Sequence, residues 1–205
     1  LISLTGFIIG IVFTNQSRPS LADLGATALL PALISVAIVR AMAPLVTALI
    51  ASGRVGSGIG AELGSMRVTE QIDAMEVSAT NPYKFLVVSR VLATTLMIPA
   101  LTMYTTFVAL MGGFVNVSQN ELTSLTTFFT QVFDAITFLD IFSSSIKSVI
   151  FGFTIGMVGC YKGYNSSKGT EGVGKAANSA VVTAMFLIFI EELLILQVVN
   201  AIRGI

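Results

Sequence analysis

The sequence predicts an all-α integral membrane protein with about five transmembrane helices. Of its 205 residues, 54% are hydrophobic and only 11% are charged, and the mean hydropathy is +0.88. Soluble domains are about 25% charged, whereas a helix that spans a bilayer needs about 20 consecutive apolar residues. The chain contains several such stretches and no internal repeat. We therefore expect one transmembrane domain over residues 1–205.

Composition also excludes several classes of function. The formal net charge is zero, which gives no field that would attract nucleic acid. There is no histidine, so imidazole catalysis and histidine-bound metals are excluded, and the single cysteine, Cys160, rules out a disulfide within the chain. Residues 169–176 resemble a phosphate-binding loop, but Ala176 replaces its hydroxyl residue. We expect no catalytic residue, no metal site and no cofactor in this chain.

The apolar runs set the expected order of the spans. The first run, residues 1–14, is too short to cross a bilayer, so we expect that further residues precede it. Prolines interrupt two later runs and predict kinks at Pro31, Pro44 and Pro99. The expected elements are a polar turn at 15–19, a second span at 24–52, a third at 91–120, a partly amphipathic loop or interfacial helix at 122–140, a fourth span at 141–161, a polar loop at 162–175 and a fifth span at 176–202.

Lysine and arginine in the loops predict the orientation, because cytoplasmic loops are enriched in both. They gather in two regions, which we place in the cytoplasm: Arg54, Arg67, Lys84 and Arg90, then Lys162, Lys168 and Lys175. With five spans, the N-terminus is cytoplasmic and the C-terminus lies on the outer side.

The stretch 53–84 is polar between long apolar runs. It opens with Gly56-x-x-x-Gly60-x-x-x-Gly64, a spacing that favours close helix packing. Residues 65–78 predict a short amphipathic helix, with Ile72 and Met75 on an apolar face. Its polar face is acidic, whereas helices on membrane surfaces usually carry lysine and arginine. We therefore favour docking to a protein over a solvated surface helix; the acidic residues are Glu70, Asp73 and Glu76.

Four charged residues fall within the predicted spans: Arg40, Lys147, Glu191 and Glu192. A charge at the centre of a bilayer costs at least about 2.5 kcal/mol, so Arg40 should face a cavity, a partner or an anion, unless it snorkels to the interface. Neighbours on a helix point about 100° apart, so Glu191 and Glu192 cannot share a side. One could pair with Lys147 or Arg40 while the other is protonated or reaches solvent; alternatively, the span is shifted and both lie at an aqueous edge.

Residues 53–56, G-R-V-G, and 61–75, A-E-L-G-S-M-R-V-T-E-Q-I-D-A-M, closely resemble the signature of the MlaE family. These proteins are permease subunits of ABC-type lipid transporters that work with MCE proteins. Weaker similarity covers nearly the whole chain: residues 10–16, Arg40 with Pro44, Asn81-Pro82, residues 146–148 and Phe151-Gly152.

The resemblance implies a non-catalytic, homodimeric permease in the cell inner membrane that moves a phospholipid. A separate ATPase subunit would bind ATP and Mg²⁺, an MCE-domain protein would exchange lipid on the periplasmic side, and the 65–78 helix would be the coupling helix. The residues implied in ATPase coupling are Glu62, Arg67, Glu70, Gln71, Asp73 and Met75. Those implied in lipid binding are Val12, Phe13 and Gln16, with Arg40 as a ligand for a lipid phosphate.

One departure from the family concerns Arg40. Many members read R-E-L-G-P where this chain reads R-A-M-A-P over residues 40–44, so any ion pair made by that acid must be absent or replaced. Two other functions stay open at this point. One is an ion-coupled secondary transporter that uses Arg40, Lys147, Glu191 and Glu192 as a charge relay; the other is a structural membrane scaffold.

Overall fold

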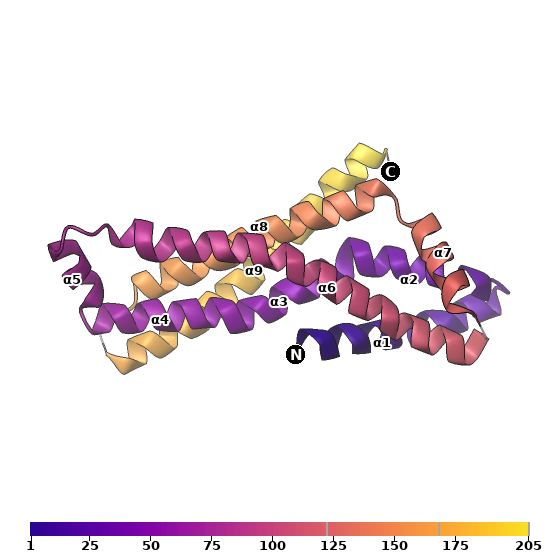
Figure 1. The fold of residues 1–205 in the computed structure, drawn as a ribbon, viewed down its shortest axis with the longest axis horizontal. Coiled ribbons are helices and arrows are strands. Elements are labelled where there is room, and N and C mark those ends of the chain that lie inside the picture. Colours follow the sequence, from indigo (N-terminus) through magenta and orange to yellow (C-terminus); the bar gives the residue numbers. More distant parts are fainter. Residues whose placement is uncertain (122, 168, 205) are drawn as a thin grey trace. The chain divides into compact units, whose positions relative to one another are not determined.

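The computed structural model describes residues 1–121, 123–167 and 169–204, and within these residues it contains helices and no strand. The all-α prediction is confirmed (Figure 1). The α-helices are α1 (Ile2–Asp23), α2 (Leu30–Ala37), α3 (Ala43–Ala51), α4 (Ser57–Val68), α5 (Gln71–Val77), α6 (Val88–Glu121), α7 (Leu125–Ala135), α8 (Phe138–Tyr164) and α9 (Thr170–Arg203). A 3₁₀ turn, η1 (Thr27–Leu29), and three π-helical turns, η2 (Ile38–Met42), η3 (Ser52–Gly56) and η4 (Tyr83–Val87), join some of them.

Four helical stretches in the described part of the chain are long and apolar enough to cross a membrane: Thr27–Val68, Tyr83–Glu121, Phe138–Tyr164 and Thr170–Arg203. The third, fourth and fifth predicted spans fall within the last three of these stretches, and the second, 24–52, overlaps the first of them from Thr27 onward. α1 is not among them, so the count of five spans stays a prediction.

The chain forms two compact units, each built from two separate segments. The first unit comprises Leu1–Thr47 and Ala100–Ile146, and the second comprises Ala48–Pro99 and Lys147–Ile205. The boundaries fall inside α3, α6 and α8. The single domain over residues 1–205 stays a prediction.

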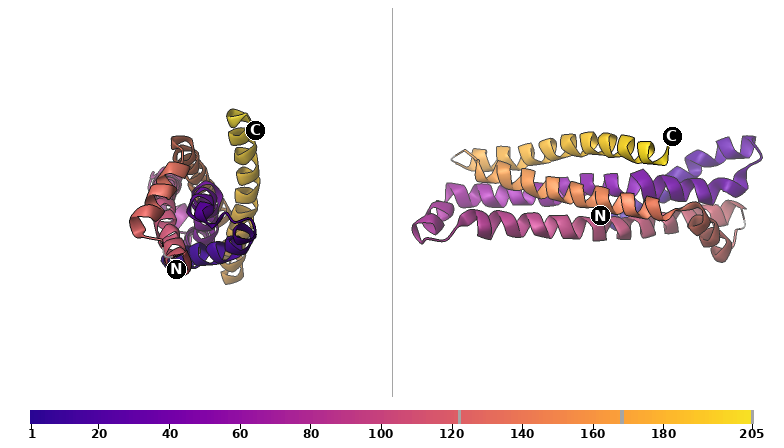
Figure 2. Two further views of the ribbon diagram at one scale, coloured as in Figure 1. Left: turned by 90° about the vertical axis from the view of Figure 1, so that its right-hand side faces the viewer. Right: turned by 90° about the horizontal axis from the view of Figure 1, so that it is seen from above.

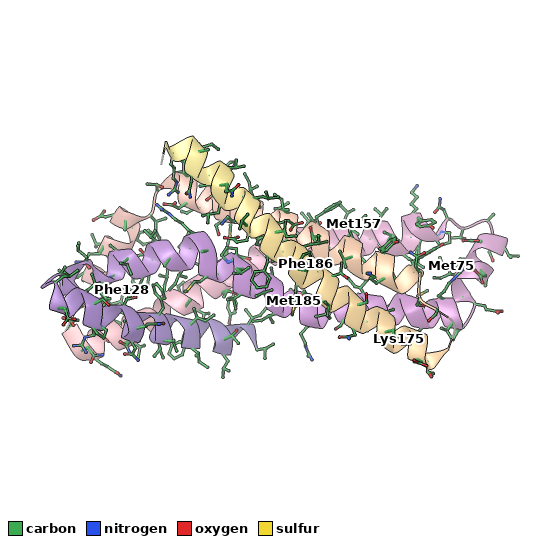
Figure 3. All side chains as sticks on the ribbon, turned by 180° about the vertical axis from the view of Figure 1, so that it is seen from behind. Met75, Phe128, Met157, Lys175, Met185 and Phe186 are labelled. Atoms are coloured by element: carbon green, nitrogen blue, oxygen red, sulfur yellow. The ribbon has the colours of Figure 1, made fainter. Side chains whose placement is uncertain are left out.

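In the first unit, α1 packs closely on α6 through glycines. A Cβ on Gly10 would meet the Ala109 carbonyl oxygen and the Gly113 amide, and a Cβ on Gly112 would meet the backbone of Phe7. These glycines let the two backbones approach closely, as is common between membrane helices. α2 and α7 complete the core around the buried Phe128 ring, which is labelled in Figure 3.

The second unit is held by the predicted glycine spacing of α4. Gly60 lies against Ala177 and Ala180 of α9, and the α8 glycines Gly159 and Gly163 lie against the segment that contains Gly56 and Gly60. α4, α8 and α9 therefore run together, as two views show (Figures 1 and 2). The prediction of a close helix contact at these glycines is confirmed.

The predicted polar turn at 15–19 is wrong, because α1 continues to Asp23. Its polar side chains bond to α6: Asn116 donates to the Asn15 amide oxygen over 2.9 Å, and Arg18 Nε lies 2.9 Å from Glu121 Oε1. Tertiary partners thus compensate for the polarity that suggested a turn.

The prolines act differently from one another. Pro31 lies in the first turn of α2, where a missing N–H breaks no helical bond, so it begins this helix and does not kink it as predicted. Pro44 is the second residue of α3, and the π-helical turn η2 that precedes α3 relieves the clash that a proline ring makes with the preceding turn. Pro99 lies inside α6 as expected.

The continuous helix predicted over 65–78 is wrong. α4 ends at Val68, Glu70 adopts a left-handed conformation with φ of 60°, and α5 covers only Gln71–Val77. The polar loop predicted at 162–175 is also shorter, because α8 runs to Tyr164 and α9 begins at Thr170. Lys168 and Leu122, which fell in predicted loops, lie outside the described residues. α7 confirms a helix within residues 122–140.

Candidate functional site

An apolar pocket of about 400 Å³ lies in the first unit, between α1 and the η2–α3 segment. Gln16 is its only polar side chain, and a pocket of this volume is in the usual range for small-molecule sites. It brings the predicted residues Val12, Phe13 and Gln16 together with five side chains that sequence reasoning missed. The complete lining is Ile8, Ile9, Val12, Phe13, Gln16, Met42, Leu45 and Val46.

Arg40 does not line this pocket. Its Nε lies 2.5 Å from Asp140 Oδ1, and its Nη2 donates to Asp140 Oδ2 over 3.2 Å. The Asp140 side chain is 0% exposed and that of Arg40 is 38% exposed. Asp140 therefore supplies a counter-ion for Arg40, which has alanine rather than an acid beside it at position 41.

Asp140 also caps α8. The backbone N–H and the hydroxyl of Thr137 both donate to Asp140 Oδ2, over 2.9 and 2.6 Å. Thr137-x-x-Asp140 is the spacing of a capping box, in which an acid in the first helical turn reaches back to the cap. This spacing is the signal in the sequence that points to the cap.

In the second unit, internal contacts occupy three of the six predicted coupling residues, Glu62, Arg67 and Asp73. Glu62 accepts from Arg90 over 2.7 Å, and Arg67 forms an ion pair with Asp73. Glu76 accepts from the hydroxyl of Tyr164 over 3.3 Å. The predicted acidic docking face is therefore reduced, because Asp73 and Glu76 are partly used within the fold.

Other predicted coupling residues face solvent or the core of the second unit. Glu70 and Gln71 are exposed at the start of α5, and Met75 is half-buried. Ile72 is fully buried and anchors α5 in a cluster with Leu63 and Leu86. α5 is thus tethered to the unit through Ile72, while Glu70 and Gln71 at its start are exposed.

A second hollow, of about 320 Å³, lies beside α5 and is lined by Ala74, Met75, Ser78, Thr80 and Phe85. Met75 marks its position in Figure 3. Apolar side chains near it are strongly exposed: Val77 by 90% and Phe85 by 66%. This combination of a hollow and exposed apolar side chains can accept a protruding apolar group from another protein.

The remaining intramembrane charges lie on α8 and α9. Lys147 Nζ lies 2.6 Å from Glu192 Oε1, with side chains only 3% and 13% exposed. Thr154 donates to Glu191 Oε1 over 2.5 Å. The hypothesis that one acid pairs with Lys147 is confirmed, and the other acid bonds to a hydroxyl group. The two Oε2 atoms are buried without a hydrogen-bond partner in the described ranges.

Sequence reasoning missed residues whose role depends on distant contacts. Tyr164 contacts α5 and also stacks on Tyr83, with ring centroids 4.6 Å apart. Arg90 is 28 positions from its partner Glu62. Neither Tyr164 nor Arg90 belongs to a local sequence motif. Of the functional residues that were missed, only Asp140 could have been recognised from the sequence, through its capping-box spacing to Thr137.

Comparisons with known proteins identify the family of this chain. Residues 1–198 match the family described as Permease MlaE. A probable ABC transporter permease of Synechocystis sp. is 39% identical over 92% of this chain and 72% of its own length. One from Rickettsia prowazekii is 36% identical, over 96% and 76%, and one from Porphyra purpurea is 37% identical, over 89% and 69%. With its four apolar helices, this chain is a multi-pass membrane protein that belongs to the MlaE permease family.

Proposed function

We propose that this chain is the permease subunit of an ATP-driven phospholipid transporter. The apolar pocket of the first unit carries the proposal, since about 400 Å³ with one polar side chain suits part of an acyl chain better than a polar solute. Val12 and Phe13 would contact the acyl chain, and Gln16 would lie towards the polar end of the lipid. The MlaE family and the ABC permease relatives support the transport role.

Arg40 remains a candidate ligand for the lipid phosphate. Its guanidinium group carries five donors, and Asp140 uses two of its nitrogens. A phosphate would therefore share Arg40 with Asp140 rather than find an uncompensated charge. Arg40→Ala should impair lipid transport while the ATPase subunit still co-purifies; unchanged transport would remove Arg40 from the site.

We further propose that α5 and its hollow dock to a separate ATPase subunit, which binds ATP and Mg²⁺. Exposed Val77 and Phe85 offer apolar contact, while exposed Glu70 and Gln71 offer polar contact at the other end of α5. On the basis of the family resemblance, we also propose that the chain forms a homodimer and works with an MCE-domain protein on the periplasmic side. It would lie in the inner membrane with its N-terminus in the cytoplasm.

The lipid proposal is tested by filling the pocket. Leu45→Trp places an indole in the pocket. It should weaken lipid binding about tenfold, which is a loss of about 1.4 kcal/mol in binding free energy. Mass spectrometry of the purified complex measures the bound phospholipid. Leu33→Trp, at a half-exposed site of α2 outside the pocket, is the matched control. Equal phospholipid in both variants and the parent would refute the proposed site.

The docking proposal is tested by adding charge to the hollow. Phe85→Glu should release the ATPase subunit during purification in detergent, because a carboxylate buried in an apolar contact loses its hydration. Leu125→Glu makes the same kind of change at an exposed position of α7 and should retain the subunit. Full ATPase stoichiometry with Phe85→Glu would contradict docking at this hollow.

No observation favours the ion-coupled carrier or the scaffold over an ABC permease. Lys147 and Glu192 neutralise each other at 2.6 Å, and Arg40 is paired with Asp140. Transport that needs ATP and continues after the proton gradient is collapsed would separate the proposal from the carrier.

A further inference from the structure

Tyr164, the last residue of α8, contacts three other elements of the second unit. Its hydroxyl donates to Glu76 of α5 over 3.3 Å. Its ring stacks on Tyr83 of η4 at 4.6 Å between centroids, and the Arg67 guanidinium of α4 lies 6.0 Å from the centre of the same ring. One side chain thus connects α8 to α4, α5 and η4.

Arg67 extends this contact to the beginning of α5. Besides lying over the Tyr164 ring, it forms an ion pair with Asp73 in the first turn of α5. Glu76 lies near the other end of the same helix. α5 is therefore held at both ends by a group that converges on Tyr164, and we name Arg67, Asp73, Glu76, Tyr83 and Tyr164 the tyrosine junction.

The segments on either side of α5 depend on surrounding contacts for their conformation. Glu70 and Ala79 flank α5, and both adopt left-handed conformations, with φ of 60° and 57°. Such conformations are unfavourable for residues other than glycine and persist only where surrounding contacts hold them. Ile72 supplies apolar anchoring, but the directional contacts come from the junction.

α8, in contrast, is firmly fixed on α4 immediately before Tyr164. A Cβ on Gly163 would lie 2.8 Å from both the Gly60 carbonyl oxygen and the Leu63 Cβ, so α8 and α4 are in close backbone contact there. The same helix carries Lys147 and Thr154, which bind Glu192 and Glu191 of α9. A displacement of α5 that reaches Tyr164 would therefore pass into α8 and its buried charge pairs.

We propose that Tyr164 is a positioning residue that makes α5 and α8 move together. One consequence of this inference is that loss of the Tyr164 ring uncouples ATP hydrolysis from lipid movement. Only this consequence rests on the proposed docking of α5 to an ATPase. The geometric part concerns the permease alone and can be measured without the ATPase.

The first test measures the distance between α5 and α8. Spin labels at Val77→Cys and Phe153→Cys, both exposed, are introduced with the buried Cys160 changed to alanine. In lipid nanodiscs, Tyr164→Ala should broaden and shift the distance distribution, as should Tyr164→Leu, which keeps apolar bulk but has no ring. Tyr164→Phe retains the stacking and should stay close to the parent. An unchanged distribution in both Tyr164→Ala and Tyr164→Leu would overturn the inference.

The matched control is Tyr161→Ala, which removes the same side chain one turn earlier on α8. Tyr161 is 65% exposed and lies outside the junction, so its loss should leave the distribution unchanged. A shift as large as that of Tyr164→Ala would show that any tyrosine lost from this helix end has the effect, and would overturn the assignment to Tyr164.

The second test uses the complex with its ATPase and MCE partners in proteoliposomes that contain fluorescent phosphatidylethanolamine. Tyr164→Ala should retain the ATPase subunit while the ATP hydrolysed per lipid moved rises at least about fivefold, the lower end of typical coupling. Phenylalanine should restore most of the coupling. An unchanged ratio in Tyr164→Ala would overturn the inference, whereas failure of the parent permease to retain an ATPase would refute the proposed function and leave the distance test in force.

Discussion

At the scale of single residues, each buried charge described above is held by a specific partner from a distant part of the chain. Lys147 lies 2.6 Å from Glu192, and Arg40 lies 2.5 Å from Asp140. Removing one member of such a pair leaves the other charge without compensation in an apolar setting. This is more destabilising than replacing both members with apolar residues. These residues are therefore sensitive positions for stability as well as candidates for function.

Asp140→Asn should destabilise the first unit, because it removes the counter-ion of Arg40 and weakens the cap of α8. Hydrogen bonds to charged groups contribute about 2 kcal/mol each, and the partial exposure of Arg40 limits the total to about that amount. Thermal unfolding in detergent measures the loss. The control is Asp134→Asn, at an exposed position on α7; an equal effect of the two substitutions would contradict this role for Asp140.

At the scale of elements, glycine contacts decide which helices can approach. Gly10 faces the α6 backbone, where a Cβ would overlap the Ala109 carbonyl oxygen, whereas Gly174 on α9 has open space around its Cβ position. The same substitution should therefore have opposite effects at the two sites.

Gly10→Ala should force α1 away from α6 and cost about 1–3 kcal/mol, as overpacking of a tight contact usually does. Gly174→Ala should be neutral or stabilising by up to about 1 kcal/mol, because alanine has the higher helix propensity. Unfolding in detergent compares the two. A stable Gly10→Ala variant would show that α1 packs on α6 less tightly than the structure indicates.

At the scale of the whole molecule, the membrane topology depends on whether α1 crosses the bilayer. The apolar runs of the sequence predict five spans, whereas four helical stretches meet the length and hydropathy of a span in the described residues. α1 has 22 residues but carries Asn15, Gln16 and Arg18, so its length would allow a crossing although its polarity weighs against one.

Cysteine labelling distinguishes the two topologies. In a Cys160→Ala background, we expect an impermeant maleimide added outside to label Leu125→Cys in intact cells and Val77→Cys only after permeabilisation. Both positions are exposed. With five spans, Leu1→Cys should also be protected until permeabilisation; labelling of Leu1→Cys in intact cells would instead favour four spans.

The sequence by itself determined the all-α membrane class, the family and most of the span positions, since apolar content and the signature at 53–75 are local properties of the chain. It also selected Val12, Phe13 and Gln16, which share one pocket.

Only the tertiary structure decided the contacts between distant segments. It continued α1 through its polar residues, divided the predicted 65–78 helix at Glu70, and placed Asp140 against Arg40 and Tyr164 against α5. Each outcome depends on a partner distant in the sequence, as Asp140 is 100 positions from Arg40 and Tyr164 is 88 from Glu76. Local propensity cannot encode such partners, because the free energy that overrides it comes from packing and charge pairing in the folded state.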